Sequence, residues 1–500
     1  MNRLSSLSFW QLSVISGLLI GLAYPPLPFG FFAWFGIVPL LILFQQASAG
    51  QGFRFGFLAS ITANLISLYW IGFNSGAGFV VVLLSLIGAV LYLAIFWGIF
   101  GFILTWVLKN SRIGIICAPL LWVIMEYLRS IGPLGFPWVD LALTQTNYLP
   151  LIQLAEVTGP SGIAFWIITL NICFLVFLDQ TSNRKRSASI ILILIFIVSF
   201  YGYQRINSVE ASINPDISVV VTQPNINPND KWDRSNRKQV FSTMHSLLDS
   251  AITLQPDLIL WPESAVPAIL RTSIVSRRPY HEKVISSNIP LLAGTVDRIT
   301  DDQGNRHYFN GSIFLNTDNS VNMYHKIHLV PFAEYIPLSE KFPKLKELNF
   351  GQGNFLPGKE FTLFNLDSVK FSNIICYESS IPNLVRKFVK MGAQFLTIES
   401  NDGWLGSTSG PYQHFALCKL RAIENRIAIA RSANTGISGV IFPSGKVVEK
   451  IPLGEKNIIF SHLPLSGKLS FYTKFGNYFA WICTAVMLIF IGITWINRNS

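Results

Sequence analysis

The amino-acid sequence predicts two structural classes in one chain, a polytopic α-helical membrane domain and an α/β domain. Of 500 residues, 51% are hydrophobic and only 13% are charged, a composition unlike that of ordinary soluble proteins. The apolar residues gather toward the two ends, whereas the region between them has a mixed, globular composition. We therefore expect a membrane domain over residues 1–205, an extramembrane domain over 206–474 and a final membrane helix within 475–500.

Eight apolar segments approach the length of about 20 residues that a helix needs to cross a bilayer. They are residues 8–24, 30–46, 54–73, 79–108, 113–130, 160–179, 187–205 and 475–496. Pro39 interrupts the second and Glu126 the fifth, so these two are the weakest. The first segment runs into Tyr24 and two prolines rather than a small-residue cleavage site, so we expect it to be retained as a span.

The basic residues predict the orientation of the membrane domain. If all eight segments cross, one side carries Arg3, Arg54, Lys109, Arg112, Arg184, Lys185, Arg186 and Arg498. Short loops rich in Lys and Arg remain in the cytoplasm. We therefore expect cytoplasmic termini and a periplasmic domain over 206–474. The net charge of +11 suits an anionic membrane surface, and we expect no nucleic-acid partner.

Short β-branched runs alternate with helical patterns between the membrane segments. Strands are expected at Ile217–Val221, Leu258–Trp261, Leu291–Thr295, Gly311–Asn316, Ser320–His325, Val369–Ile375, Phe395–Glu399, Ile427–Arg431 and Val440–Ile441. Helices are expected at Arg237–Leu254, Ile381–Met391 and Tyr412–Glu424, and loops at 224–228, 301–305 and 351–358. This alternation indicates an α/β layered domain.

Three expected strand ends carry the residue types of a thiol acyl-transfer site. Glu263, Lys326 and Cys376 each follow a strand candidate at once or within two residues. A thiol supplies a nucleophile, a carboxylate takes its proton, and an ammonium stabilises the charge that develops on the acyl oxygen. A helix just after Cys376 would favour the thiolate. Taken singly, the three are equally compatible with a structural thiol, a solvated turn residue and an exposed lysine.

The other four cysteines indicate neither a disulfide framework nor a metal site. Cys117, Cys173 and Cys483 lie in apolar spans and Cys418 on a helical pattern, where thiols behave as small hydrophobic groups. No close pairing of cysteines or histidines has metal-ligand spacing. We therefore expect no metal and no cofactor.

Longer motifs surround the three candidates. They are 222–225, Lys231-Trp232, Trp261-Pro262-Glu263-Ser264-Ala265, 325–337, Ile375-Cys376-Tyr377-Glu378, 400–404, 410–414, 421–425 and 431–436, with 126–129 and 135–138 in the membrane region. In this order they resemble the carbon–nitrogen hydrolase (nitrilase) superfamily, and the whole chain resembles the apolipoprotein N-acyltransferase family. The chain departs from the family pattern at Ala333, Gly403 and Leu405, which affects local loop shape.

The resemblance implies an α-β-β-α sandwich with a Glu263–Lys326–Cys376 triad. Glu263 would be the general base and Cys376 the nucleophile, while Lys326 and the Tyr377 backbone N–H would support the oxyanion. Glu334 would orient Lys326 or share protons with Glu263. Further functional positions would be Trp232, Tyr377 and Glu378. Glu126 and Arg129 would form either a structural ion pair or a substrate contact.

The implied activity is that of a bacterial inner-membrane N-acyltransferase. It would move a fatty acyl chain from a phospholipid, through a thioester on Cys376, to the α-amine of a diacylglyceryl-apolipoprotein. We expect a monomer that needs no nucleotide. Two alternatives stay open: a membrane-anchored amidase of the same superfamily, for which one anchor would suffice, and a transporter or receptor with an enzyme-like exterior, which the few intramembrane charges disfavour.

Overall fold

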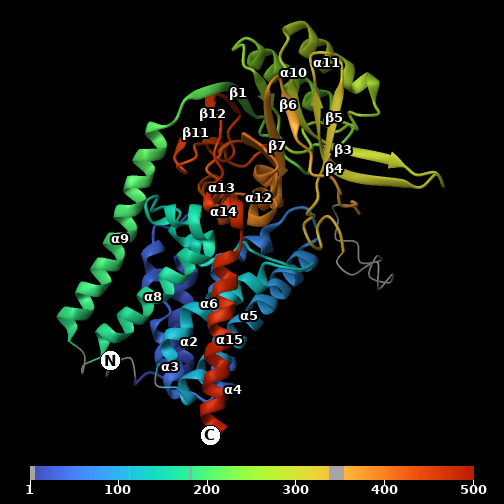
Figure 1. Cartoon of the computed structure of the whole chain (residues 1–500). Helices are drawn as coiled ribbons and strands as arrows, with labels where there is room; N and C mark the ends of the chain where they lie inside the picture. The colour runs from blue at the N-terminus through green and yellow to red at the C-terminus, as the bar shows by residue number, and fades with distance from the viewer. Residues whose placement is uncertain (1–5, 112, 180–182, 337–353, 500) are drawn as a thin grey trace. The chain divides into compact units, whose positions relative to one another are not determined.

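The computed structural model describes residues 6–111, 113–179, 183–336 and 354–499. The chain divides into two compact units (Figure 1). The first comprises Met1–Gly72, Leu83–Ser208 and Lys474–Ser500, and the second comprises Phe73–Val82 and Val209–Thr473. The end of the 325–337 motif and the first part of the loop expected at 351–358 lie outside the described residues.

The first unit is built of apolar helices. They are α2 (Phe9–Leu22), α3 (Val38–Gln46), α4 (Ala49–Ser67), α5 (Phe79–Asn110), α6 (Cys117–Arg129), α7 (Ala155–Thr158), α8 (Pro160–Leu178), α9 (Arg184–Ala211) and α15 (Tyr478–Asn499). The segment expected at 30–46 is a 3-10 turn, Gly30–Trp34, followed by α3. The helix restarts there because Pro39 fits only its first turn.

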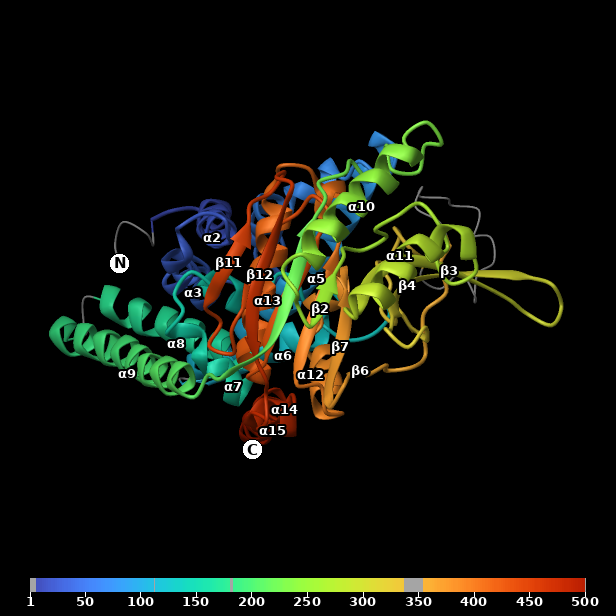
Figure 2. The ribbon, with the colours of Figure 1, turned by 90° about the horizontal axis from the view of Figure 1, so that it is seen from above.

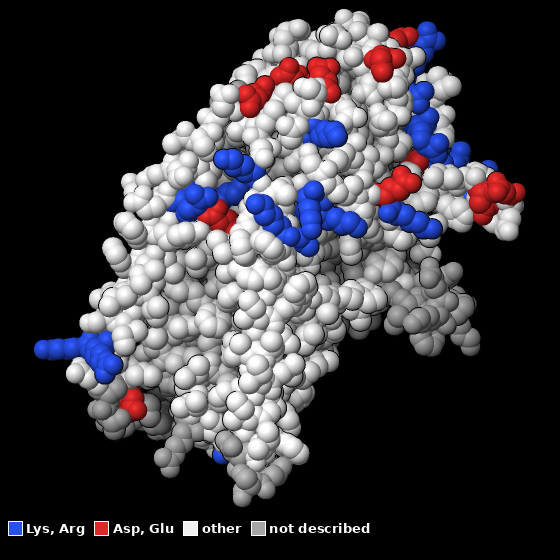
Figure 3. Space-filling view, viewed as in Figure 1, with Lys and Arg blue, Asp and Glu red and all other residues white. Residues whose placement is uncertain are grey.

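Four helices in the described part of the chain are long and apolar enough to cross a bilayer. They are Phe79–Asn110, Pro160–Leu178, Arg184–Ala211 and Tyr478–Ile496, and shorter apolar helices cover Phe9–Leu22 and Gly30–Gln46. The face shown in Figure 3 carries almost no charged side chain around α15, whose Leu488 and Ile489 are exposed. These features suit contact with lipid. The number of about eight spans stays a prediction.

Two six-stranded sheets form the second unit. The first has the order β12-β1-β2-β3-β4-β5, and the second β11-β10-β9-β8-β7-β6. The strands of the first are β1 (Pro215–Gln223), β2 (Leu258–Leu260), β3 (Leu291–Thr300), β4 (Arg306–Leu315), β5 (Val321–His325) and β12 (Asn457–Pro464). Those of the second are β6 (Phe364–Leu366), β7 (Val369–Ile375), β8 (Phe395–Ser400), β9 (Ala428–Ala433), β10 (Ser438–Ile441) and β11 (Val447–Ile451).

In each sheet the three central strands are parallel and the flanking strands are antiparallel. The last strand, β12, pairs with the first, β1, along its whole length, as Figure 2 shows in red and green. The C-terminal part of the chain therefore closes the same sheet that the N-terminal part of this unit opens.

Helices cover the outer faces of the two sheets. Side chains of α10 (Arg237–Ile252) and α11 (Ile274–Ser287) pack on the first sheet in one apolar cluster with Ile259 and Trp261. The second sheet is covered by α12 (Pro382–Lys390) and α13 (Ser409–Asn425). Between the sheets, the rings of Phe314 and Phe371 meet edge to face at 5.5 Å. The expected layered α/β domain is confirmed, with the layer order α-β-β-α.

The expected elements differ from the structure mainly at strands and helices that show no clear hydrophobic periodicity. Strand β4 begins at Arg306, five residues before the expected start, because its polar first half pairs with the equally polar end of β3. The sequence analysis missed α11, which holds Pro279 and lacks an apolar stripe. It also missed the edge strands β6, β11 and β12. Strands β6 and β11 have only three and five residues, so their signals are weak, whereas β12 lies outside the expected strands although it contains the apolar run Ile458-Ile459-Phe460.

Candidate active site

The three predicted catalytic residues follow strand ends of both sheets. Glu263 comes shortly after β2, Lys326 directly after β5 and Cys376 directly after β7. The Lys326 ammonium lies 3.7 Å from a Glu263 carboxylate oxygen. The backbone at Lys326 is fixed by its N–H, which donates to the Asn310 carbonyl at 2.8 Å. The structure therefore brings the base and the cation of the predicted triad together at the seam between the sheets.

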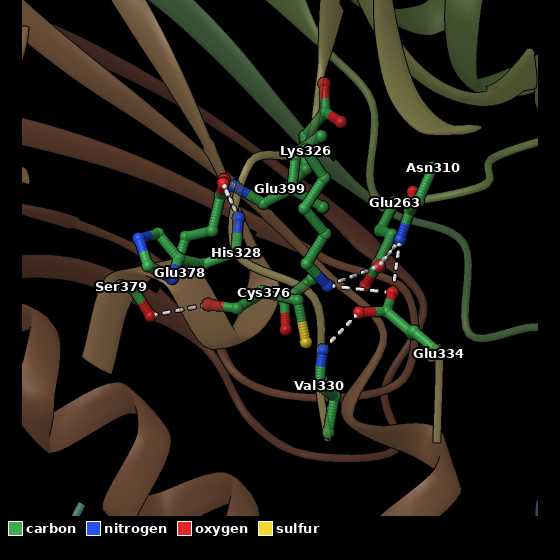
Figure 4. Close-up of polar contacts among 12 residues, drawn as sticks. Glu263, Asn310, Lys326, His328, Val330, Glu334, Cys376, Glu378, Ser379 and Glu399 are labelled. Atoms are coloured by element: carbon green, nitrogen blue, oxygen red, sulfur yellow. Dashed lines mark hydrogen bonds and ion pairs between the residues drawn. The ribbon is translucent and has the colours of Figure 1, made fainter. Parts of the chain in front are cut away.

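Asn310 and Glu334 complete a buried polar network around Lys326 (Figure 4). The Lys326 ammonium donates to Glu334 Oε1 at 2.9 Å. The Asn310 amide donates to the same oxygen at 2.8 Å and to Glu263 Oε1 at 2.7 Å. The second Glu334 oxygen accepts from the Val330 backbone N–H at 2.7 Å. Glu334 therefore orients Lys326, and Asn310 bridges the two carboxylates.

The network keeps Lys326 charged although its side chain is buried. Burial alone would lower the pKa of the lysine, but the charges of Glu334 and Glu263 outweigh it and raise the pKa above its usual value. A permanently charged ammonium beside the nucleophile is suited to stabilising an oxyanion.

Cys376 begins a 3-10 turn, Cys376–Ser380, rather than an α-helix. Its backbone φ is +50°, a left-handed conformation that is strained for a residue with a side chain. The turn redirects the chain as β7 ends, and α12 begins only at Pro382.

The surroundings of the Cys376 thiol oppose the thiolate that the expected helix would favour. Burial and the negative charge of Glu263 raise the pKa of the Cys376 thiol, and the nearby Lys326 charge only partly opposes them. Moreover, the expected helix dipole is displaced because the chain forms a 3-10 turn first. These surroundings favour the protonated thiol, whose proton the predicted base Glu263 is expected to remove.

Glu378 holds the backbone around the nucleophile and the cation. Its carboxylate accepts hydrogen bonds from the Tyr324 hydroxyl and from the backbone N–H groups of Ile327, His328 and Ile375, at 2.7–3.1 Å. Burial raises the pKa of Glu378, against the effect of these bonds and of the Lys326 charge. Glu378 thus ties the loop after β5 to the end of β7.

Trp232 and Tyr377 differ in exposure. Trp232 is half-exposed and Tyr377 is buried. The neighbour of Trp232, Lys231, is buried, and its ammonium donates to the Ser264 carbonyl at 3.0 Å. Burial lowers the pKa of Lys231 to about 8, while the charge of Glu263 opposes the shift. Lys231 is therefore a second buried cation close to the predicted base, and the sequence analysis gave it no role.

Comparisons with known proteins show which family the chain resembles. Residues 16–173 match the family of apolipoprotein N-acyltransferase N-terminal domains, and residues 219–467 match the carbon–nitrogen hydrolase family. The protein named apolipoprotein N-acyltransferase from Chlorobaculum tepidum is 31% identical, over 97% of this chain and 96% of its own. The chain belongs to the apolipoprotein N-acyltransferase family.

The chain is also similar to a second curated relative and to several solved structures. The protein of this name from Geobacter metallireducens is 31% identical, over 95% of this chain and 93% of its own. Among solved structures, an amidase from Nesterenkonia sp. covers 51% of this chain and 93% of its own, with a TM-score of 0.38 and 18% identity. A carbon–nitrogen hydrolase from Helicobacter pylori covers 49% and 89%, with a TM-score of 0.40 and 16% identity.

A second polar cluster includes Cys376, the predicted nucleophile. Cys376, Asp402 and His414 each offer one potential metal-ligating atom, and these atoms lie within 4.8 Å of one another. However, Asp402 is held by His414 at 2.7 Å and by Arg431 at 2.7 Å. The arginine supplies the charge that a metal would otherwise bring, so the arrangement is that of an internal ion-pair network.

Sequence reasoning missed Asn310, Lys231 and the ring of His414. The strand expected at Gly311–Asn316 began one residue too late to include Asn310. His414 lies in the 410–414 motif, but the spacing of the histidines predicts no metal site and gave this ring no role. A polar residue inside an otherwise apolar helix or strand was the available signal, since buried polar groups normally have specific partners.

Gly294→Ala should impair acyl transfer to Cys376 without unfolding the protein. A Cβ at Gly294 would lie 2.5 Å from the Glu263 Cα and 2.5 Å from the Pro262 oxygen, so the base must shift. A displacement near 1 Å costs about 10²-fold in rate. The rate of Cys376 acylation by a p-nitrophenyl ester measures the effect. Gly467→Ala is the control, since nothing lies within 4 Å of its added Cβ; equal rates in the two variants would contradict the prediction.

Alkylation of resting Cys376 should be slow at neutral pH and should keep rising above pH 9. The raised pKa leaves little thiolate at pH 7, and the thiolate fraction grows until the pH passes that pKa. Iodoacetamide modification, followed by peptide mass spectrometry between pH 6 and pH 10, tests this. Glu263→Gln should not slow alkylation, because the charge that raises the pKa is removed. A plateau at or below pH 8 would disprove the neutral resting thiol.

Proposed function

We propose that this protein N-acylates lipoproteins, moving a fatty acyl chain from a membrane phospholipid to the α-amine of a diacylglyceryl-cysteine. One observation carries the proposal. A thiol, a carboxylate and a buried ammonium follow the ends of β7, β2 and β5 in a chain whose relatives, over nearly their full length, are named apolipoprotein N-acyltransferase.

In the first half-reaction, the Cys376 sulfur attacks the ester carbonyl of the phospholipid while Glu263 takes the thiol proton. The negative charge on the carbonyl oxygen is stabilised by the Lys326 ammonium and by the Tyr377 backbone N–H. The ester C–O bond then breaks, and Glu263 returns the proton to the leaving alkoxide. A lysophospholipid departs, and the acyl chain remains as a thioester on Cys376.

In the second half-reaction, the amine of the acceptor attacks the thioester carbonyl. The amine transfers a proton to Glu263, and the same oxyanion donors stabilise the intermediate. The C–S bond breaks, the amide is released, and the thiolate regains a proton from Glu263. Conversion of an ester through a thioester to an amide is downhill, so the transfer needs no nucleotide.

The membrane setting follows from the substrates. Both are lipids with almost no concentration in water, so the enzyme must meet them at a bilayer, where its apolar helices would hold it. In this proposal the α/β unit lies on the periplasmic side of a bacterial inner membrane. The enzyme acts as a monomer, and Trp232 and Tyr377 line the path of the lipids.

Incubation of the purified protein with phospholipid alone should add the mass of one acyl chain and release one equivalent of lysophospholipid. The added mass should be labile to hydroxylamine, as a thioester is, and a diacylglyceryl peptide should then discharge it. Cys376→Ser should abolish the adduct, since a hydroxyl is a weak nucleophile at neutral pH. Glu263→Gln and Lys326→Met should reduce its formation by about 10²-fold or more.

Each alternative predicts a different result in this assay. An amidase would discharge the thioester to water at the same rate with and without the amine acceptor. A receptor or transporter would form no adduct. Lysophospholipid that appears only when both lipids are present would show direct transfer and would contradict the acyl-enzyme.

The proposed topology predicts opposite labelling of two introduced cysteines. Asn305 and Asn183 are both exposed, and the charge distribution predicts that they lie on opposite sides of the membrane. An impermeant maleimide should label Asn305→Cys in intact spheroplasts, and Asn183→Cys only after permeabilisation. The unsubstituted protein gives the background. The reverse pattern would place the thiol site in the cytoplasm, and the proposed function would then be wrong.

A further inference from the structure

A hydrogen-bonded chain ends on the backbone carbonyl of the nucleophile. The Cys376 carbonyl oxygen accepts from the Ser379 hydroxyl at 2.8 Å, a bond drawn in Figure 4. The Nε2 atom of His414 lies 3.0 Å from the same oxygen and 2.8 Å from the Ser379 hydroxyl. Nothing in the triad chemistry explains why two side chains gather at this one oxygen.

The Nδ1 side of the His414 imidazole contacts Asp402. Its Nδ1 atom lies 2.7 Å from Asp402 Oδ1, which also accepts from the Ser400 hydroxyl at 2.8 Å. Arg431 donates to the second Asp402 oxygen at 2.7 Å. Although burial disfavours a charged carboxylate, Arg431 and His414 hold the pKa of Asp402 below its usual range. Asp402 is therefore an acceptor, and Nδ1 carries a proton.

With Nδ1 protonated, the orientation of the ring is fixed. Nε2 then faces the Ser379 hydroxyl and the Cys376 oxygen, and it accepts from the hydroxyl when the ring is neutral or donates when the ring is charged. A charged ring and the hydroxyl supply two protons to the three groups, whereas with a neutral ring the single hydroxyl proton goes either to Nε2 or to the Cys376 oxygen. All of them are buried except Cys376, which is half-buried.

The carbonyl of Cys376 and the N–H of Tyr377 belong to one planar peptide unit. In a trans peptide the C=O and N–H bonds point in opposite directions, so fixing the oxygen fixes the direction of the N–H. The unit needs fixing because it follows a residue with φ of +50°. That N–H is the backbone donor assigned to the oxyanion in the proposed mechanism.

We propose that His414 and Ser379 are positioning residues that clamp the Cys376 carbonyl and thereby aim the Tyr377 N–H at the oxyanion. The proposal rests on the proposed acyl transfer through Cys376. Asp402 and Arg431 fix the orientation of the His414 ring, through the contact of Asp402 with Nδ1. Neither His414 nor Ser379 removes a proton from the thiol, which stays the task of Glu263.

Two reactions of the same thiol separate this role from a general loss of structure. Acylation by a p-nitrophenyl ester passes through an oxyanion, whereas alkylation by iodoacetamide displaces iodide at a tetrahedral carbon and forms none. The experiment measures both rates at Cys376 in the full-length protein in micelles. Because the ester replaces the phospholipid, the comparison stays valid even if the protein does not use phospholipid as donor.

Ser379→Ala and His414→Ala should lower the acylation rate by up to about 10²-fold, as loss of an oxyanion donor does, and leave alkylation unchanged. His414→Gln, whose amide reaches the position of Nε2, should recover part of the loss. Ser380→Ala is the matched control, since its hydroxyl donates to the Tyr377 carbonyl at 2.7 Å in the same turn. Its ratio of acylation to alkylation should equal that of the unsubstituted protein.

Three results would overturn the clamp. A parallel fall of both rates in Ser379→Ala and His414→Gln would show a structural role only. An unchanged ratio in both variants would show that the carbonyl contact does not affect the oxyanion. An equal loss in Ser380→Ala would show that any hydrogen bond of the turn has the same effect.

Discussion

The active site depends on one constraint, the burial of the Lys326 ammonium between two carboxylates. A lone buried ammonium would lose its proton or disrupt the fold. The negative charges of Glu334 and Glu263 keep the ammonium protonated. Asn310 donates a hydrogen bond to each of the two carboxylates and so fixes their relative positions. Removing one member of such a buried pair costs about 3–5 kcal/mol. The stability of this unit and the electrostatics of the site therefore depend on the same contacts.

Burial and charge together favour the protonated form of the thiol. Burial is the main cause of the raised pKa of the Cys376 thiol, and the negative charge of Glu263 raises it further although Lys326 opposes it. The Lys231 ammonium interacts with Glu263 and partly compensates the negative charge of that carboxylate. A thiol that ionises only when Glu263 accepts its proton is protected from oxidation, because the thiolate is the form that is oxidised.

The sequence predicted the elements with strong local signals and missed those that depend on tertiary pairing. Glu263, Lys326 and Cys376 were found because each follows a short β-branched run, and parallel strands end at one edge of a sheet. Their roles came from resemblance to a family. The left-handed backbone at Cys376, the bridge through Asn310 and the ring of His414 left no periodic trace, since each depends on residues distant in sequence.

The two-sheet core has a catalytic consequence beyond stability. Glu263 and Lys326 follow strands of the first sheet and Cys376 follows a strand of the second, so the spacing between the sheets affects the distance between them. Phe314 against Phe371 sets that spacing in the apolar layer. Ser312 sets it in the polar layer, because it accepts from Asn373 at 2.6 Å and donates to Glu399 at 2.7 Å. Burial raises the pKa of Glu399 well above its usual value. This shift favours a protonated carboxyl group, which accepts the Ser312 hydrogen bond without adding a negative charge near the candidate site. Packing far from the thiol therefore determines whether base, cation and nucleophile reach one acyl carbon.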